Sequence, residues 1–142
     1  MRVYTFDNIN DMNEFSDAFG KWLDDVIPND LPEETVALAF NIYEDKDNFW
    51  SCEVIATNAF DAEDVSGDWA CCEISHFDTR EDKLFAWQQF DEFNVILEKL
   101  KYALNQYLEN GKKAKIMKET AGVGMGFVDD DLELMYVNQK EN

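Results

Sequence analysis

The chain has 142 residues, of which 46% are hydrophobic and 14% aromatic, and its 31 acidic against 12 basic residues give a formal net charge of −19 at pH 7. This length and aromatic content predict one folded domain over residues 1–142 and exclude an acidic disordered tail. The acidic balance argues against nucleic-acid binding, because contacts with phosphates need a basic face.

The negative charge is concentrated in the first part of the chain. Between Val3 and Thr79 there are 19 acidic residues and only two basic ones, Lys21 and Lys46, whereas the remainder is nearly balanced. Like charges repel each other in a compact state, so such a concentration lowers stability. Two explanations stay open: the charge serves solubility alone, or it is complementary to a basic partner and accelerates association about 10- to 1,000-fold.

The N-terminal part of the chain predicts a strand followed by a helix. Residues 3–6 have strand character, and Asp7 or Asn8 is expected to cap the helix that follows. Pro28 ends the helical pattern. The apolar residues that recur at helical spacing are Ile9, Met12, Phe15, Phe19, Trp22, Leu23 and Val26.

Three strands are predicted next. Apolar and small residues alternate over 36–43 and predict a strand, which the polar loop 44–48 connects to a return strand over 49–57. An acidic loop over 58–68 then leads to a third strand over 69–77. Sequential strands usually lie next to each other, so these three are expected to form a meander.

A long helix is predicted in the second half of the chain. Residues 84–90 are interpreted as its approach, and Asn110-Gly111 as its C-terminal stop. Residues 112–120 are expected to add a helical turn. The apolar stripe of the long helix consists of Phe93, Ile96, Leu97, Leu100, Ala103, Leu104, Tyr107 and Leu108.

Two strands complete the predicted fold. The segments 121–128 and 132–137 predict a hairpin across the turn 129–131, and residues 138–142 are expected to form a frayed tail. The full order is β-α-β-β-β-α-β-β, in which runs of adjacent strands favour antiparallel pairing. The predicted fold is an α+β two-layer sandwich: a mostly antiparallel sheet with two main helices on one face. The strand order stays open.

The glycine run of Gly122, Gly124 and Gly126 is interpreted as a packing feature. A phosphate loop needs a helix directly after the glycines, and here the chain continues into a strand and a turn. With a period of two, all three glycines lie on one face of that strand. A smooth glycine face favours the close approach of a helix or a large aromatic side chain.

Cys52, Cys71, Cys72 and His76 are the residues that could suggest a metal site. Adjacent cysteines on a strand point to opposite faces, so one ion cannot easily use both Cys71 and Cys72. We therefore predict buried structural cysteines and no metal ligands. The odd, sparse cysteine count also argues against a disulfide framework and for a reducing compartment.

No pattern in the chain predicts catalysis or membrane insertion. The N-terminal residues lack the basic and apolar regions of a signal peptide, and no apolar run approaches the ~20 residues needed to span a bilayer. No nucleophile motif surrounds any serine, and the single histidine, His76, is interpreted as a surface or hydrogen-bonded residue. We expect a cytoplasmic protein without enzymatic activity, cofactor or membrane contact.

Two acidic segments form the candidate site for a partner. The loop 58–68 has no basic residue and is followed by Trp69, and an acidic rim around an aromatic anchor is typical of an interface for a basic protein. The alternative is a solvated loop beside a core tryptophan. This loop and the acidic hairpin loop 44–48 border the same three-strand meander, and we expect that end of the sheet to contact the partner. The candidate residues are Glu44, Asp45, Asp47, Asp61, Glu63, Asp64, Asp68 and Trp69.

In size, charge, α+β element order and absence of catalytic motifs, the chain resembles the small acidic cytoplasmic immunity proteins that bacteria use against nuclease-type toxins. The segment Leu31-Pro32-Glu33-Glu34 is similar to the Leu-Pro helix start of one broad immunity superfamily. The aromatic–Asn-Gly-Gly segment of that superfamily is missing, and the element order differs. No functional residue is therefore transferred.

The resemblance implies a non-enzymatic protein that covers the basic, nucleic-acid-binding cleft of a toxin with carboxylates. Three alternatives follow from the same sequence. The chain could be a nucleic-acid mimic that inhibits a DNA-binding protein, an enzyme with an unrecognised carboxylate site, or a small cytoplasmic protein whose charge serves only solubility. The oligomeric state is left open.

Overall fold

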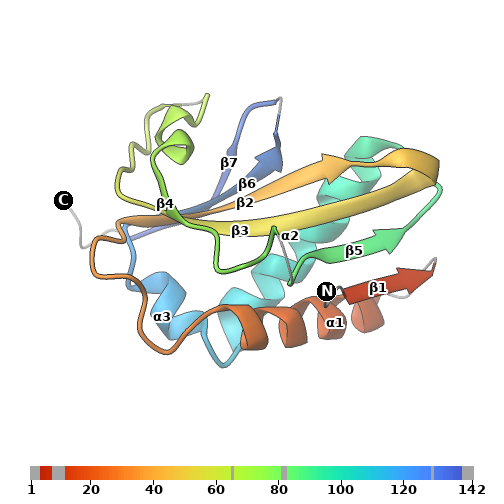
Figure 1. Ribbon diagram of the computed structural model, residues 1–142, viewed down its shortest axis with the longest axis horizontal. Coiled ribbons are helices and arrows are strands. Elements are labelled where there is room, and N and C mark those ends of the chain that lie inside the picture. Colours follow the sequence, from red (N-terminus) through yellow and green to blue (C-terminus); the bar gives the residue numbers. More distant parts are fainter. Residues whose placement is uncertain (1–3, 8–11, 65, 81–82, 129, 139–142) are drawn as a thin grey trace.

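The structure is a computed structural model that describes residues 4–7, 12–64, 66–80, 83–128 and 130–138 (Figure 1). Its helices are α1 (Met12–Val26), α2 (Phe93–Asn110) and the short α3 (Ala114–Lys118). Its strands are β1 (Tyr4–Asp7), β2 (Ala37–Glu44), β3 (Phe49–Thr57), β4 (Glu73–Ser75), β5 (Phe85–Gln88), β6 (Gly122–Phe127) and β7 (Glu133–Val137). The connections contain two 3-10 helices, η1 (Lys46–Asn48) and η2 (Asp68–Cys71).

These strands form one sheet in the order β1-β5-β3-β2-β6-β7, and β4 pairs with β3. The pairs β2–β3, β3–β4, β3–β5 and β6–β7 are antiparallel. The pairs β1–β5 and β2–β6 are parallel, and each joins strands that are far apart in the chain, because parallel strands need a long connection. The predicted α+β class with a mostly antiparallel sheet is confirmed.

Both main helices cover one face of the sheet, which we call the inner face (Figure 1). Helix α1 contributes Phe15, Phe19 and Trp22 to the core, all without exposed surface. The ring of Phe19 meets that of Phe85 edge to face, with 5.4 Å between their centroids. Dense aromatic burial of this kind is the main source of stability in the fold, because it removes large apolar areas from water.

The segment predicted as the approach to the long helix is instead a strand, so that prediction was wrong. Strand β5 pairs antiparallel with β3 and parallel with β1. Phe85 and Trp87 are fully buried on the inner face, and the intervening Ala86 and Gln88 are half-buried. This alternation with a period of two is the signature of a strand, which a four-residue segment shows only weakly.

The third strand of the predicted meander is shorter than expected. Its first residues form η2, and only Glu73–Ser75 pair with β3. The turn begins at Gly67, whose φ of +73° favours glycine. Because Cys71 and Cys72 lie at this turn, both are exposed, whereas Cys52 is buried. The prediction of buried cysteines was therefore right for Cys52 and wrong for the other two.

The predicted frayed tail was wrong for its first residue, Asn138. The backbone N–H of Asn138 donates to the carbonyl of Ala121 at 2.9 Å, and its side-chain amide donates to the carbonyl of Lys118 at 3.2 Å. Asn138 is therefore held against the body of the protein. The rest of the tail, 139–142, lies outside the described residues, as do the predicted helix cap Asn8 and Ile9.

The opposite side of the sheet, the outer face, is covered by the loop between β3 and β4, drawn yellow-green in Figure 1. Its rings pack on the glycines of β6, as the glycine run predicted. A Cβ atom at Gly122 would lie 2.3 Å from the ring of Phe60. One at Gly124 would lie 2.6 Å from the side chain of Leu132 and 3.2 Å from that of Trp69. The glycines leave room for these side chains, which explains the run without a bound phosphate.

Candidate binding surface

A buried carboxylate on the outer face is the centre of the candidate site. Glu53 lies in the middle of β3 and has no exposed surface. Asn41 Nδ2 and Tyr43 OH each donate a hydrogen bond to Glu53 Oε2 at 2.8 Å. Arg80 donates from Nε to Glu53 Oε1 at 2.6 Å. A buried charge needs such partners, because transfer out of water is costly without them.

Arg80 is placed beside Glu53 by a side chain that substitutes for a strand partner. Strand β3 pairs with β5 up to Cys52 and with β4 from Ala56. Between these stretches, the hydroxyl of Thr79 accepts a hydrogen bond from the N–H of Val54 at 3.3 Å and lies 3.2 Å from its carbonyl oxygen. Buried Thr79 thus fixes the chain next to β3, and Arg80 follows directly.

Arg80 also binds a second carboxylate. Its Nη1 donates to Glu73 Oε2 at 2.9 Å, and its Nη2 forms a further contact with the same group. The side chain of Arg80 remains 42% exposed, so the cluster is reached by solvent on this side. We call Asn41, Tyr43, Glu53, Glu73 and Arg80 the outer-face cluster.

The outer-face cluster controls the ionisation of its members. Burial alone would raise the pKa of Glu53, but the hydrogen bonds from Arg80, Asn41 and Tyr43 outweigh it and hold that pKa below its ordinary value. Burial and the hydrogen bond to Glu53 raise the pKa of Tyr43 to about 12. Glu53 is therefore a carboxylate and Tyr43 a neutral donor over the physiological pH range.

Above this cluster the surface is hollowed. The outer-face hollow has a volume of about 400 Å³. Its floor includes the cluster, and the exposed acidic residues on its rim are Asp68 and Asp130. The aliphatic side chains of Ile55 and Leu132 also line it, so that the hollow combines carboxylates with apolar walls.

A second hollow adjoins the first and is more apolar. This end hollow, of about 610 Å³, lies where β2 and β6 end beside the start of α2. Its large exposed apolar residues are Phe93 and Val128, at 55% and 44%. The residues that line it are Ile42, Tyr43, Glu44, Phe93, Phe127, Val128 and Asp130, and it shares Tyr43, Phe127, Val128 and Asp130 with the outer-face hollow.

The two hollows together carry an acidic surplus. Among the described residues that line them, Arg80 is the single basic one, and it pairs with two carboxylates. The acidic lining residues are Glu44, Glu53, Asp68, Glu73 and Asp130. A concave site with low-dielectric walls strengthens the field of such charges, which favours a cationic group over an anionic or neutral one.

The structure separates the two acidic segments that the sequence analysis placed at one end of the sheet, so that prediction was wrong. The hairpin turn precedes Phe49 and the long loop follows Thr57, at opposite ends of β3 and about 26 Å apart along the strand. The long loop then folds back over the outer face. Consequently Asp68 lines the outer-face hollow and Glu44 lines the adjoining end hollow.

The remaining predicted site residues differ in what they do. Asp45 and Asp47 are exposed on the hairpin turn, and Asp61 and Glu63 are exposed on the long loop. Asp64 is structural, because its carboxylate accepts hydrogen bonds from the hydroxyl and N–H of Ser66 and from the N–H of Asp68. These bonds lower the pKa of Asp64.

Trp69 is 4% exposed and does not present its ring to solvent. It packs edge to face on Phe60, with 4.9 Å between ring centroids, and covers the small residues of the outer face. The aromatic side chain exposed beside the carboxylates is instead Phe93.

The outer-face cluster was missed by the sequence analysis. One signal was present: Glu53 is the only charged residue within the otherwise apolar or small strand 49–57. An isolated charge in a strand buried on both faces requires a partner. The identity of that partner could not be read from the sequence, because Arg80 is 27 positions away.

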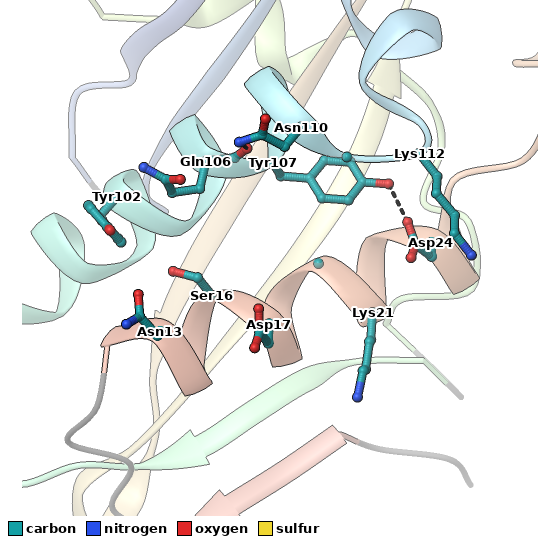
Figure 2. Close-up of a pocket in the computed structure, with 12 residues that line it drawn as sticks. Asn13, Ser16, Asp17, Lys21, Asp24, Tyr102, Gln106, Tyr107, Asn110 and Lys112 are labelled. Carbon is teal, nitrogen blue, oxygen red and sulfur yellow. Dashed lines mark hydrogen bonds between the residues drawn. The ribbon is translucent and has the colours of Figure 1, made fainter.

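A third cleft, of about 380 Å³, lies between α1 and α2 (Figure 2). The hydroxyl of Tyr107 donates to Asp24 Oδ1 at 2.6 Å across it, and burial raises the pKa of Tyr107 above its ordinary value. The charged residues of this cleft balance one another: Asp17, Lys21, Asp24 and Lys112. It shares no residue with the two hollows and has no surplus charge, so we assign it no part in binding a basic partner.

No group of His, Cys, Asp and Glu side chains within the described ranges is arranged to hold a metal ion. Over the same residues, no helix combines the length and the apolar character needed to cross a membrane. Comparisons with known proteins give no match: no protein-family model fits the chain, and no curated protein and no solved structure matches it.

Proposed function

We propose that this chain is a non-enzymatic binding protein that takes a basic protein partner on the two adjoining hollows. One observation carries the proposal: within the described ranges, five carboxylates and a single guanidinium line these hollows, next to exposed apolar side chains. Carboxylates around apolar contact area are the chemistry with which proteins recognise basic proteins. In line with the resemblance to immunity proteins, the partner would be a nuclease-type toxin.

Two of the three alternative functions, the nucleic-acid mimic and the enzyme, fit this surface less well. A nucleic-acid mimic needs carboxylates spaced over an extended surface, whereas here they line hollows with apolar walls. An enzyme using Glu53 as a general acid would need its pKa raised, and the outer-face cluster lowers it. Binding without chemistry is therefore the function best supported.

The test compares two pairs of charge-neutralising substitutions in exposed residues. The first pair, Glu44→Gln with Asp68→Asn, removes one charge from each hollow. The matched control, Glu63→Gln with Asp61→Asn, removes the same charge from two exposed residues of the long loop that line neither hollow. Affinity is measured for a basic protein captured from the native host and then purified.

We expect the first pair to weaken binding about tenfold or more and the control pair to change it less than about threefold, since electrostatic attraction between exposed charges falls steeply with distance and screening. Affinity should also fall as salt rises. Equal effects of the two pairs, or an affinity that ignores salt, would contradict the proposal.

A further inference from the structure

The end hollow indicates the chemistry of the partner's contact segment. Resting on the proposed function, we propose that the partner inserts an apolar side chain into the end hollow, between Phe93, Phe127 and Val128. Lysine or arginine residues beside that side chain then meet Glu44 and Asp130 on the rim. The partner segment is thus basic and also carries an apolar anchor, so that its binding depends on both charge and apolar contact.

The walls of the end hollow are held in place before any partner arrives. The ring of Phe127 contacts that of Phe93 edge to face, with 5.9 Å between centroids. It also packs edge to face on the buried ring of Trp50, with 6.0 Å between centroids. Because Phe127 is fixed between strand β3 and helix α2, an apolar side chain can enter without ordering the wall first, which favours affinity.

Large apolar side chains in and near this hollow are exposed in the part of the chain that the structure describes. Phe93 is 55% exposed although it begins the buried stripe of α2, and Val128 is 44% exposed directly after β6. Phe90, at 63%, lies near the hairpin turn, since the N–H of the preceding Gln89 donates to the carbonyl of Asn48 at 2.9 Å. Exposed aromatic side chains of this kind are enriched at protein interfaces.

The charge around the hollow selects the occupant. The rim carries Glu44 and Asp130, and the hairpin turn beside it adds Asp45 and Asp47 against a single basic residue, Lys46. A second copy of this chain, with its net charge of −19, would be repelled by such a rim. Charge complementarity therefore favours a basic segment of another protein as the occupant of the hollow.

Two synthetic peptides test this inference. Both are rich in lysine and equal in length and charge, and they differ only at the central residue, which is tryptophan in one and serine in the other. Affinities are measured by NMR titration of the labelled protein, which also locates the contact. We expect the tryptophan peptide to bind about tenfold more tightly, because an apolar side chain gains by leaving water.

Matched substitutions show whether the end hollow is responsible. Val128→Ser should abolish the preference for tryptophan, whereas Val95→Ser, a residue of nearly equal exposure (43%) outside the hollow, should retain it. Phe93→Ala should act like Val128→Ser. Circular dichroism checks that each variant is folded, which is expected because all three side chains are exposed.

Equal affinity of the two peptides, no binding by either, or a tryptophan preference that survives both Val128→Ser and Phe93→Ala would overturn the inference. The proposed function fails differently. If binding of a basic partner still depends on Glu44 and Asp68 but not on Phe93 or Val128, the protein binds by charge alone and only the anchor is disproved.

Discussion

The two faces of the sheet carry different kinds of side chain. The inner face is filled by large rings such as Phe19, Phe40 and Trp87, all without exposed surface. The outer face has glycine and alanine on β6 and β2, covered by two rings from the long loop, and beside them a partly buried ionic cluster. Stability is therefore concentrated on the inner face, whereas the outer face carries the ionic cluster and the hollow above it.

The difference follows from what each kind of contact contributes. Burial of aromatic side chains stabilises in proportion to the apolar area removed from water. A buried ion pair contributes little net stability, because the loss of hydration offsets the attraction. The outer-face cluster is thus weak support for the fold, yet it holds carboxylates in fixed positions beneath a hollow.

The largest expected effect on stability comes from removing a buried ring from the inner face. Phe19→Ala should lower the free energy of unfolding by about 3–5 kcal/mol, because it removes a fully buried ring and leaves a cavity. Phe60→Ala, which removes a half-buried ring from the outer face, should cost about 1–2 kcal/mol. Urea denaturation with an unchanged m value measures both. Similar losses for the two variants would contradict the division of roles between the faces.

A smaller effect is expected from Arg80→Ala, which leaves Asn41 and Tyr43 as the donors to buried Glu53 among the described residues. We expect the free energy of unfolding to fall by about 2 kcal/mol at neutral pH. This is less than for a fully buried pair, because Arg80 is partly exposed. Arg80→Lys should restore part of it, since an ammonium cannot reproduce the paired contacts of a guanidinium.

The loss caused by Arg80→Ala should depend on pH. In the native protein the pKa of Glu53 lies below its unfolded value, so its contribution is present above about pH 4.3 and is lost as the pH falls through the folded pKa. Without Arg80, burial should raise that pKa and favour the neutral acid. The difference in unfolding free energy between the native protein and Arg80→Ala should therefore shrink on acidification. A constant difference from pH 7 to pH 3 would contradict the stabilisation of ionised Glu53 by Arg80.

The smallest effects distinguish two glycines. A Cβ at Gly122 would lie 2.3 Å from Phe60, so Gly122→Ala should cost about 1–2 kcal/mol by overpacking the outer face. In helix α1, a Cβ at Gly20 would meet its nearest neighbour at an ordinary 3.4 Å. Gly20→Ala should therefore stabilise by about 0.5–1 kcal/mol, because alanine favours the helix. Thermal unfolding of both variants tests this, and a destabilised Gly20→Ala would contradict the packing described for that helix.

The inner face was largely determined by the sequence alone. The stripe of α1 predicted the burial of Phe15, Phe19 and Trp22, and the return strand has the predicted bounds, 49–57. These features are encoded locally, since hydrophobic periods of 3.6 and two residues reveal which side of a helix or strand faces the core. The glycine run of β6 likewise predicted close aromatic packing, although not that Phe60 and Trp69 would supply it.

Only the tertiary structure decided which carboxylates meet around the two hollows. The sequence shows Glu53, Glu44 and Asp68 as three acidic residues among many. It does not distinguish a carboxylate that is solvated from one that is paired with Arg80. Strand order and the return of the long loop over the outer face set which of them meet. The physical reason is range: periodicity acts between neighbours in the chain, whereas ion pairs and hollows join residues that only the folded sheet brings together.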